Sequence, residues 1–154
     1  MGTQHKVEVE LATAVSDDLT RAIARLVRQL SSSARVPEAE DLQRIVESPS
    51  SQLLIALDAD GVVVGMLALA VFRIPTGIRA WIEDVVVDEA ARGRGVGEAL
   101  TREALRLADA AGARTVDLTS RPEREQANRL YRRLGFEPRN TNVYRFTLPS
   151  EWKV

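Results

Sequence analysis

Two acidic side chains, Glu83 and Asp84, stand together in the apolar stretch WIEDVVV at 81–87. A carboxylate is costly in an apolar strand unless it faces water or a partner. One interpretation is therefore structural, with ion pairs to Arg73 or Arg79. The other is chemical, because a carboxylate attracts an ammonium group and, directly or through a water, takes its proton to leave a nucleophilic amine.

Alternation along the strand is expected to place these two carboxylates on opposite faces of a sheet. The predicted faces are Trp81, Glu83 and Val85 on one side and Ile82, Asp84 and Val86 on the other. Trp81 could form an aromatic wall for a cationic group beside Glu83, or it could simply belong to the core.

A cluster of glycines follows this strand in ARGRGVGEAL, where every second position is Gly93, Gly95 or Gly97. Glycine costs conformational entropy in ordered structure, so the cluster indicates that the backbone approaches something closely. Arg92 and Arg94 add positive charge and hydrogen-bond donors that suit an anion.

Three kinds of phosphate-binding turn can be compared with this cluster. A Walker A loop requires Gly-Lys-Ser/Thr, but Glu98 follows Gly97, and a dinucleotide-binding turn requires glycine at position 98. Both are excluded. A pyrophosphate turn, in which backbone N–H groups and a helix N-terminus point at the anion, fits the pattern. The alternative is a tight strand-to-helix turn with solvated arginines.

The composition narrows the chemistry further. The chain of 154 residues suits one domain, 1–154, and its net charge of −1 favours neither nucleic acid nor a membrane surface as a partner. Cysteine is absent and His5 is the only histidine, so neither a Ser-His-Asp triad nor a metal site is expected. Acid–base chemistry is left to Glu, Asp, Tyr, Lys or bound water. The start lacks a secretory signal, which favours a cytoplasmic protein.

Periodicity and capping residues predict the elements that position these residues. Helices are expected at 16–31 with Ser16 as N-cap, at 37–48, at 95–111 and at 124–135. Strands are expected at 6–11, 51–58, 62–74, 79–89 and 114–120, with a final hairpin in 136–148. The predicted apolar stripes are Leu19, Ile23, Leu26, Val27 and Leu30 in the first helix and Val96, Leu100, Ala104, Leu107 and Ala111 in the third. The strand–helix–strand order of the second half indicates at least one parallel pairing.

The turn R92-G-R-G95-V-G97, together with IEDVVVDEAA before it, resembles the acetyl-CoA-binding segment of the GNAT superfamily of N-acetyltransferases. ANRLYRRLGFEP at 127–138 is similar to a later helix of that family, and the two segments follow in the family's order. The resemblance implies an α/β fold with a mixed, mostly antiparallel central sheet flanked by helices. It also implies that a parallel strand pair, Trp81–Val87 and Thr115–Thr119, splays apart.

The resemblance further implies acetyl-CoA as the co-substrate, without a metal. Backbone amides from Gly93 to Gly97 would hold its pyrophosphate, and its pantetheine arm would enter the gap between the splayed strands, with the Val85 amide at the thioester carbonyl. The implied coenzyme-binding residues are Val85, Val86, Val87, Arg92, Gly93, Arg94, Gly95, Val96 and Gly97. Asn128, three residues before Tyr131, is a further candidate contact or merely a surface residue. The valines also fit a plain buried strand. Arg124 stands where the family often has an asparagine that contacts the arm, which leaves that contact open.

Catalytic roles are implied in the same way. IEDVVV is similar to the strand of diamine and spermidine acetyltransferases, in which the first acid is the base and its neighbour helps to bind the amine. Glu83 is thus the predicted base, and Asp84 and Trp81 are predicted to bind the substrate. Tyr131 matches the tyrosine that protonates the departing coenzyme A thiolate, although its spacing also fits the apolar face of its helix.

The implied function is direct transfer of an acetyl group, in a ternary complex, to the primary amine of a small and cationic acceptor. A chain without cysteine cannot form an acetyl-cysteine intermediate. Two alternatives stay open: a non-catalytic acyl-CoA-binding module, and an acyltransferase that acts on protein N-termini or uses a longer acyl group. The end LPSEWKV permits a homodimer, with Trp152 as a packing plug or an interface anchor.

Overall fold

The structure, a computed structural model, describes residues 6–150, so His5 and Trp152 lie outside the described residues. The chain divides into two compact units at the junction of Arg121 and Pro122. The first unit contains the sheet and the helices α1 to α3, and the second contains α4. Each unit is described by itself.

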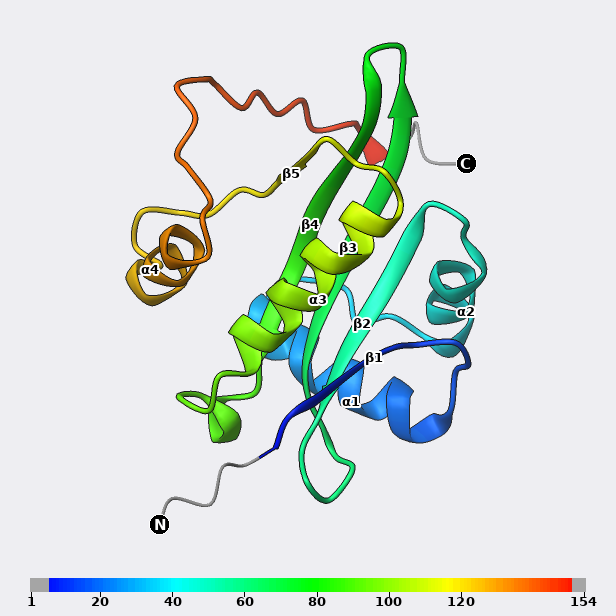
Figure 1. The fold of residues 1–154 in the computed structure, drawn as a ribbon. Helices are drawn as coiled ribbons and strands as arrows, with labels where there is room; N and C mark the ends of the chain where they lie inside the picture. The colour runs from blue at the N-terminus through cyan, green and yellow to red at the C-terminus, as the bar shows by residue number, and fades with distance from the viewer. Residues whose placement is uncertain (1–5, 151–154) are drawn as a thin grey trace. The chain divides into compact units, whose positions relative to one another are not determined.

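The sheet of the first unit has five strands in the order β1-β2-β3-β4-β5 (Figure 1). Neighbouring strands are antiparallel except β4 and β5, which are parallel. This confirms the predicted mixed, mostly antiparallel sheet. The strands are β1 (Glu8–Leu11), β2 (Ser51–Leu57), β3 (Val63–Ile74), β4 (Gly77–Val87) and β5 (Thr115–Asp117).

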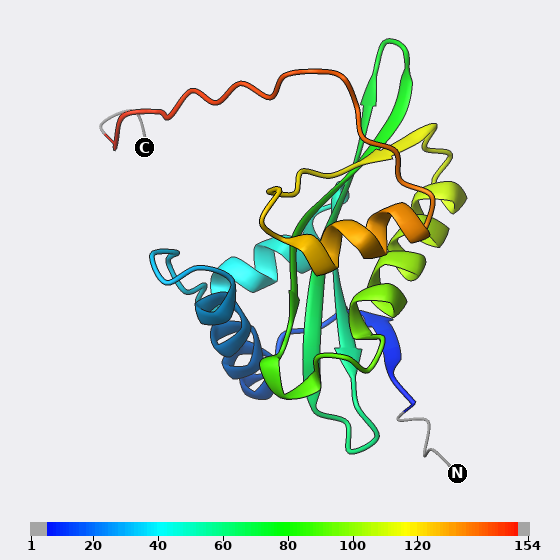
Figure 2. The ribbon, with the colours of Figure 1, turned by 90° about the vertical axis from the view of Figure 1, so that its left-hand side faces the viewer.

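Helices cover both faces of this sheet. The helices α1 (Asp17–Leu30) and α2 (Ala39–Glu47) lie on one face, and α3 (Val96–Ala110) lies on the other (Figure 2). The predicted N-cap of α1 is confirmed, because Ser16 Oγ accepts a hydrogen bond of 3.1 Å from the Leu19 amide. Both faces of the central strands are therefore covered over part of their length.

The buried stripes of α1 and α3 differ from the prediction at their ends. Leu30, the last residue of α1, is exposed, whereas the rest of the predicted stripe is buried against Met66 and Val86. In α3 the buried residue of the last turns is Ala108, and Ala111 is the exposed C-cap. Both errors fall where the helix ends and the chain leaves its helical path.

A bulge interrupts β4 beside β3. Two residues of β4, Asp84 and Val85, stand opposite one residue of β3, and Asp84 has a φ of 51°. A bulge inserts an unpaired residue, and Asp tolerates this left-handed conformation better than most side chains. The register pairs on its two sides are Met66 with Val86 and Ala68 with Glu83.

The bulge makes part of the predicted alternation wrong. Ile82 pairs with Leu69, on the same face of β3 as Gly65, which approaches α3. Val86 instead belongs to the core beneath α1. Ile82 and Val86 therefore lie on opposite faces and cannot both share a face with Asp84, because the extra residue reverses the alternation.

The second unit contains α4 (Glu125–Arg133), which ends in a Schellman motif. Gly135 has a φ of 100°, and its amide donates to the Arg132 carbonyl at 3.1 Å. The Phe136 amide donates to the Tyr131 carbonyl at 2.9 Å, and the two rings pack edge to face with centroids 5.6 Å apart. The Gly-Phe pair thus ends the helix and packs against its last buried turn.

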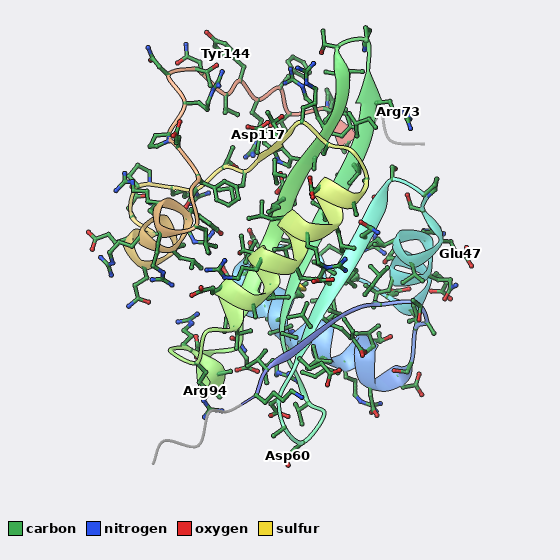
Figure 3. The ribbon with its side chains drawn as sticks, in the orientation of Figure 1. Glu47, Asp60, Arg73, Arg94, Asp117 and Tyr144 are labelled. Atoms are coloured by element: carbon green, nitrogen blue, oxygen red, sulfur yellow. The ribbon has the colours of Figure 1, made fainter. Side chains whose placement is uncertain are left out.

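The predicted hairpin in 136–148 is wrong, because the structure has no strand in that range. Its first arm was to begin at Phe136, but the Phe136 amide caps α4, and Pro138 has no amide hydrogen to donate to a strand partner. The apolar side chains of the second arm, including Tyr144 (labelled in Figure 3), are exposed.

Candidate coenzyme-binding turn and acidic strand

The glycine turn between β4 and α3 has the backbone that its sequence predicts. Gly93 and Gly95 have φ values of 78° and 77°, in the left-handed region that favours glycine. A Cβ atom added to either would find no other atom within 4 Å, so open space surrounds this backbone. Arg92 and Arg94 are exposed there, and Arg94 is labelled on the turn in Figure 3. Gly97 differs, because it lies in the first turn of α3.

The N-terminus of α3 is open to an anion. Gly95 is its N-cap residue, and no side chain caps the first amides. The unpaired N–H groups at the start of a helix carry partial positive charge and bind phosphates readily. Val96 is buried at 2% exposure, which fixes the first turn of the helix against the sheet.

Gly65 of β3 allows α3 to lie close to the sheet at this end. A Cβ atom on Gly65 would stand 2.8 Å from Val96 Cγ1 and 3.1 Å from Leu100 Cδ1. Such contacts are too short for any side chain, so only glycine fits between the strand and the helix. The position of the N-terminal end of α3 therefore depends on a glycine that sequence analysis did not select.

The parallel strands β4 and β5 part beside the acidic residues. Their pairing ends at Trp81 and Asp117, whereas β4 continues to Val87. This confirms the splayed strand pair. Beyond that point, Val85 and Val87 are half-buried and the Val86 side chain is buried in the core, so only their backbone is suited to meet an extended ligand.

Ser120 lies just beyond β5, and sequence analysis missed it. Its hydroxyl oxygen is buried and has no hydrogen-bond partner among residues 6–150. A buried hydroxyl without a partner is uncommon in native structures and indicates a site for a water or a ligand group. A serine after the diverging strand was the only signal in the sequence.

Glu83 is held by its neighbour on the same face of β4. Trp81 Nε1 donates a hydrogen bond of 2.8 Å to Glu83 Oε1, which confirms that the two side chains share a face. Their partners on β3 are the small residues Ala68 and Ala70, both only half-buried. Glu83 itself is exposed, with one carboxylate oxygen engaged by the indole.

Asp84 sits at the bulge with its carboxyl partly desolvated. That desolvation, reinforced by the negative charge of Glu83, raises the pKa of Asp84 above its usual 3.8. Among the ion pairs of the described residues, none joins Glu83 or Asp84 to Arg73 or Arg79. The structural interpretation of the two acids as ion-pair partners is therefore not supported.

Tyr131 and Asn128 lie on α4 in the second unit. Tyr131 is 6% exposed, and its burial raises the pKa of the phenol, although the charge of Arg124 opposes that shift. The hydroxyl is therefore protonated at neutral pH. Asn128 is half-buried, and its backbone N–H donates to the Arg124 carbonyl at 2.9 Å within the helix.

The described part of the chain has neither a cluster of metal ligands nor a membrane-spanning helix. Within residues 6–150 no three His, Cys, Asp or Glu side chains gather in a way that would hold a metal ion. No helix in that range is both long enough and apolar enough to cross a bilayer.

Together, the mostly antiparallel sheet flanked by helices, the splayed strand pair and the glycine turn ahead of α3 define the fold class of this α/β protein. The sequence pattern of the Acetyltransferase (GNAT) family matches residues 19–136, and the chain belongs to that family.

Two curated relatives agree with this membership. Glucosamine 6-phosphate N-acetyltransferase 1 of Oryza sativa subsp. japonica is 33% identical over 140 residues, which cover 82% of this chain and 79% of the relative. Mycothiol acetyltransferase of Beutenbergia cavernae is 37% identical over 90 residues, which cover 58% of this chain. This match spans only 29% of that longer relative.

Solved structures show the same fold. An aminoglycoside acetyltransferase from an uncultured soil metagenomic sample, in complex with trehalose, superposes with a TM-score of 0.80. The match covers 93% of this chain and 97% of that chain at 20% sequence identity. At this identity the likeness concerns the fold alone.

Proposed function

We propose that this acetyltransferase moves an acetyl group from acetyl-CoA directly to the primary amine of a small, cationic molecule. The observation that carries the proposal is the Glu83 carboxylate, held at 2.8 Å by the Trp81 indole on the strand that diverges from β5. A fixed carboxylate beside an aromatic face suits a substrate ammonium, which it attracts and then deprotonates.

The residues at the turn fit coenzyme A. The two glycines with positive φ leave open space at an uncapped helix N-terminus, where a side chain would otherwise stand. The amides from Gly93 to Gly97 would hold the diphosphate, and Arg92 and Arg94 would add charge. When bound, acetyl-CoA supplies the acetyl group as a thioester.

The gap beside β4 fits the rest of the coenzyme. The backbone of Val85, Val86 and Val87 would hold the pantetheine arm, with the Val85 N–H at the bulge donating to the thioester carbonyl. The unpartnered Ser120 hydroxyl is a further candidate contact. Asn128 is also proposed as a coenzyme contact, from α4.

Proton transfers are assigned to two residues. Glu83 accepts one proton from the substrate ammonium and passes it to solvent, so that the neutral nitrogen can form the new C–N bond as the C–S bond breaks. The nitrogen loses its second proton to water in the same step, and this proton restores the phenol of Tyr131 after that residue has protonated the thiolate. Tyr131, whose phenol is protonated at neutral pH, donates its proton to the departing thiolate. Asp84 and Trp81 would bind the acceptor, and Asp84 adds negative charge next to Glu83.

The names of similar proteins support a small-molecule acceptor. Glucosamine 6-phosphate N-acetyltransferase and aminoglycoside acetyltransferase are both named for small amino-sugar substrates. For this chain the two adjacent carboxylates favour a cationic amine over a carboxylate-rich one.

A thiol-release assay with acetyl-CoA and a panel of polyamines, aminoglycosides, amino acids and peptides tests this function. Release with at least one small cationic amine is expected. Release with peptides alone would favour a protein N-terminus as the acceptor, and faster release from succinyl- or propionyl-CoA would change the acyl donor. Coenzyme binding without release under any condition would indicate a non-catalytic binding module.

A further inference from the structure

The segment that joins β4 to the glycine turn is held by a charged pair. Asp88 Oδ2 accepts a hydrogen bond of 3.0 Å from Arg25 Nε, and Asp88 Oδ1 accepts one of 3.1 Å from the Ala90 amide. Arg25 Nη2 also donates to the Val63 carbonyl at 2.6 Å. One arginine of α1 thus connects the end of β4 to the beginning of β3.

A second side chain of α1 holds the next residue. Gln29 Oε1 accepts a hydrogen bond of 3.0 Å from the Glu89 amide. Gln29 stands four residues after Arg25, so both side chains project from the same side of the helix. The Asp88 amide is fixed in turn by the Val64 carbonyl at 2.8 Å. We call Arg25, Gln29 and Asp88 the α1 clamp.

The electrostatics of the clamp favour an ionised Asp88. Partial burial alone would raise the pKa of Asp88, but hydrogen bonds from the Ala90 amide, Arg25 and Gln29, with the positive charge of Arg25, lower it below its usual value. The Asp88 side chain is 15% exposed and that of Arg25 is 43% exposed. An ion pair with this exposure adds little to global stability, so its effect is local.

The clamp lies immediately before the most permissive backbone of the first unit. Asp88 caps the short 3-10 helix η1 (Glu89–Ala91), whose last residue is buried. The turn from Arg92 to Gly95 follows at once, exposed and with two glycines at positive φ. Glycine has the widest range of backbone conformations, so the glycines alone do not fix the direction of the turn amides. That direction depends on how the residues before the turn are held.

We propose that Arg25, Gln29 and Asp88 are positioning residues for coenzyme binding, because they fix from α1 the segment that aims the glycine-turn amides. This inference rests on the proposed function. Among the hydrogen bonds and ion pairs of the described residues, none joins the clamp to Glu83 or Trp81, so its loss should weaken acetyl-CoA binding and leave the proton transfers unchanged.

Titration calorimetry with acetyl-CoA, together with steady-state kinetics, tests the clamp in the full chain. Arg25→Met, Gln29→Leu and Asp88→Asn each remove a clamp contact, and Asp88→Asn keeps an oxygen for the Ala90 amide. Arg25→Met and Asp88→Asn are each expected to raise the Kd and KM for acetyl-CoA about tenfold, the effect of losing one charge-assisted hydrogen bond, and Gln29→Leu, which loses a neutral one, about fivefold. The kcat should stay within about twofold of wild type.

Arg21→Met is the matched control. Arg21 also lies on α1 and forms an exposed ion pair of 2.6 Å with Asp18, but it has no contact with the β4–α3 segment among the described hydrogen bonds. Its acetyl-CoA affinity should equal that of wild type. The double variant Arg25→Met/Asp88→Asn should bind no more weakly than the weaker single variant, because both changes break the same contact.

The possible outcomes separate the clamp from the proposed function. Clamp variants with a lower Tm but wild-type acetyl-CoA affinity would show a structural brace and overturn the proposal. A fall in kcat without a change in Kd would do the same. Wild-type protein that binds no acetyl-CoA would overturn the proposed function itself, and the clamp's role with it.

Discussion

Glu83 and Trp81 show how two neighbouring positions of one strand face can form a chemical unit. The indole N–H engages one carboxylate oxygen at 2.8 Å and leaves the other oxygen for a substrate. Their register partners on β3 are Ala68 and Ala70, whose side chains are small. A carboxylate in such surroundings can act on an amine without losing its orientation.

Replacing Glu83 with glutamine tests the proposed base. The amide oxygen of Glu83→Gln can still accept the Trp81 hydrogen bond, so the local geometry should persist while the proton acceptor is lost. The kcat is expected to fall by about 100-fold or more, and the calorimetric Kd for acetyl-CoA should stay within about twofold. Glu10→Gln, an exposed carboxylate of β1, is the control. A wild-type kcat in Glu83→Gln would remove Glu83 from the role of base.

Asp84 provides a prediction on stability and pH. The pKa of Asp84 is raised in the folded protein, so ionisation of this carboxyl opposes folding. Below the usual pKa of 3.8 the carboxyl is protonated in both states and does not change the free energy of unfolding. As the pH rises through the folded pKa, ionisation lowers the free energy of unfolding. Asp84→Asn should therefore raise Tm at pH 7 relative to wild type, and by less at pH 3. Asparagine also suits the positive φ, but that benefit does not change with pH. An equal gain at both pH values would contradict the desolvation of the carboxyl.

At the scale of elements, three residues shape the turn and the helix that follows it, where we propose that the coenzyme diphosphate binds. Gly95 adopts the left-handed backbone conformation at the N-cap of α3, and the buried Val96 fixes the first turn of the helix. Gly65 lets β3 approach α3 closely. The bulge in β4 also shapes this region, because it places an unpaired residue near the point where β4 and β5 part.

Gly95 can be compared with a glycine of similar φ at the opposite end of α3. Gly112 follows the C-cap of α3 with a φ of 81°, and a Cβ atom there would meet only Ile78 Cδ1, at an ordinary contact distance of 3.6 Å. Gly95→Ala and Gly112→Ala should therefore lower the free energy of unfolding similarly, by about 1 kcal/mol. Only Gly95→Ala should weaken acetyl-CoA binding. Equal Kd values in the two folded variants would separate the turn from coenzyme binding.

At the scale of the whole molecule, composition limits the mechanism. A chain without cysteine has no thiolate to carry the acetyl group between two half-reactions. Direct transfer with both substrates bound is therefore our prediction. Initial velocities measured against both substrates should give intersecting double-reciprocal lines. Parallel lines would indicate an acetylated enzyme and contradict direct transfer.

Much of the first unit could be predicted from local patterns. The Ser16 cap and the glycine turn ahead of α3 follow from residue types and their spacing. Element order predicted a parallel pairing, and the family resemblance assigned it to β4 and β5. The final hairpin failed, because alternation in 136–148 does not reveal that Phe136 is taken up by the end of α4. Alternation shows that a segment could form a strand, but tertiary contacts decide whether another strand is available to pair with it.

The sequence by itself determined which chemical groups this protein carries: a glycine turn that suits an anion, two carboxylates in an apolar strand, and no thiol. Only the tertiary structure decided which faces these carboxylates share, because the bulge at Asp84 reverses the alternation that a uniform strand would have. It also brought Arg25 and Gln29 of α1 to the residues before the turn, some 60 positions away. Such contacts join distant segments through side-chain geometry, which no local pattern encodes.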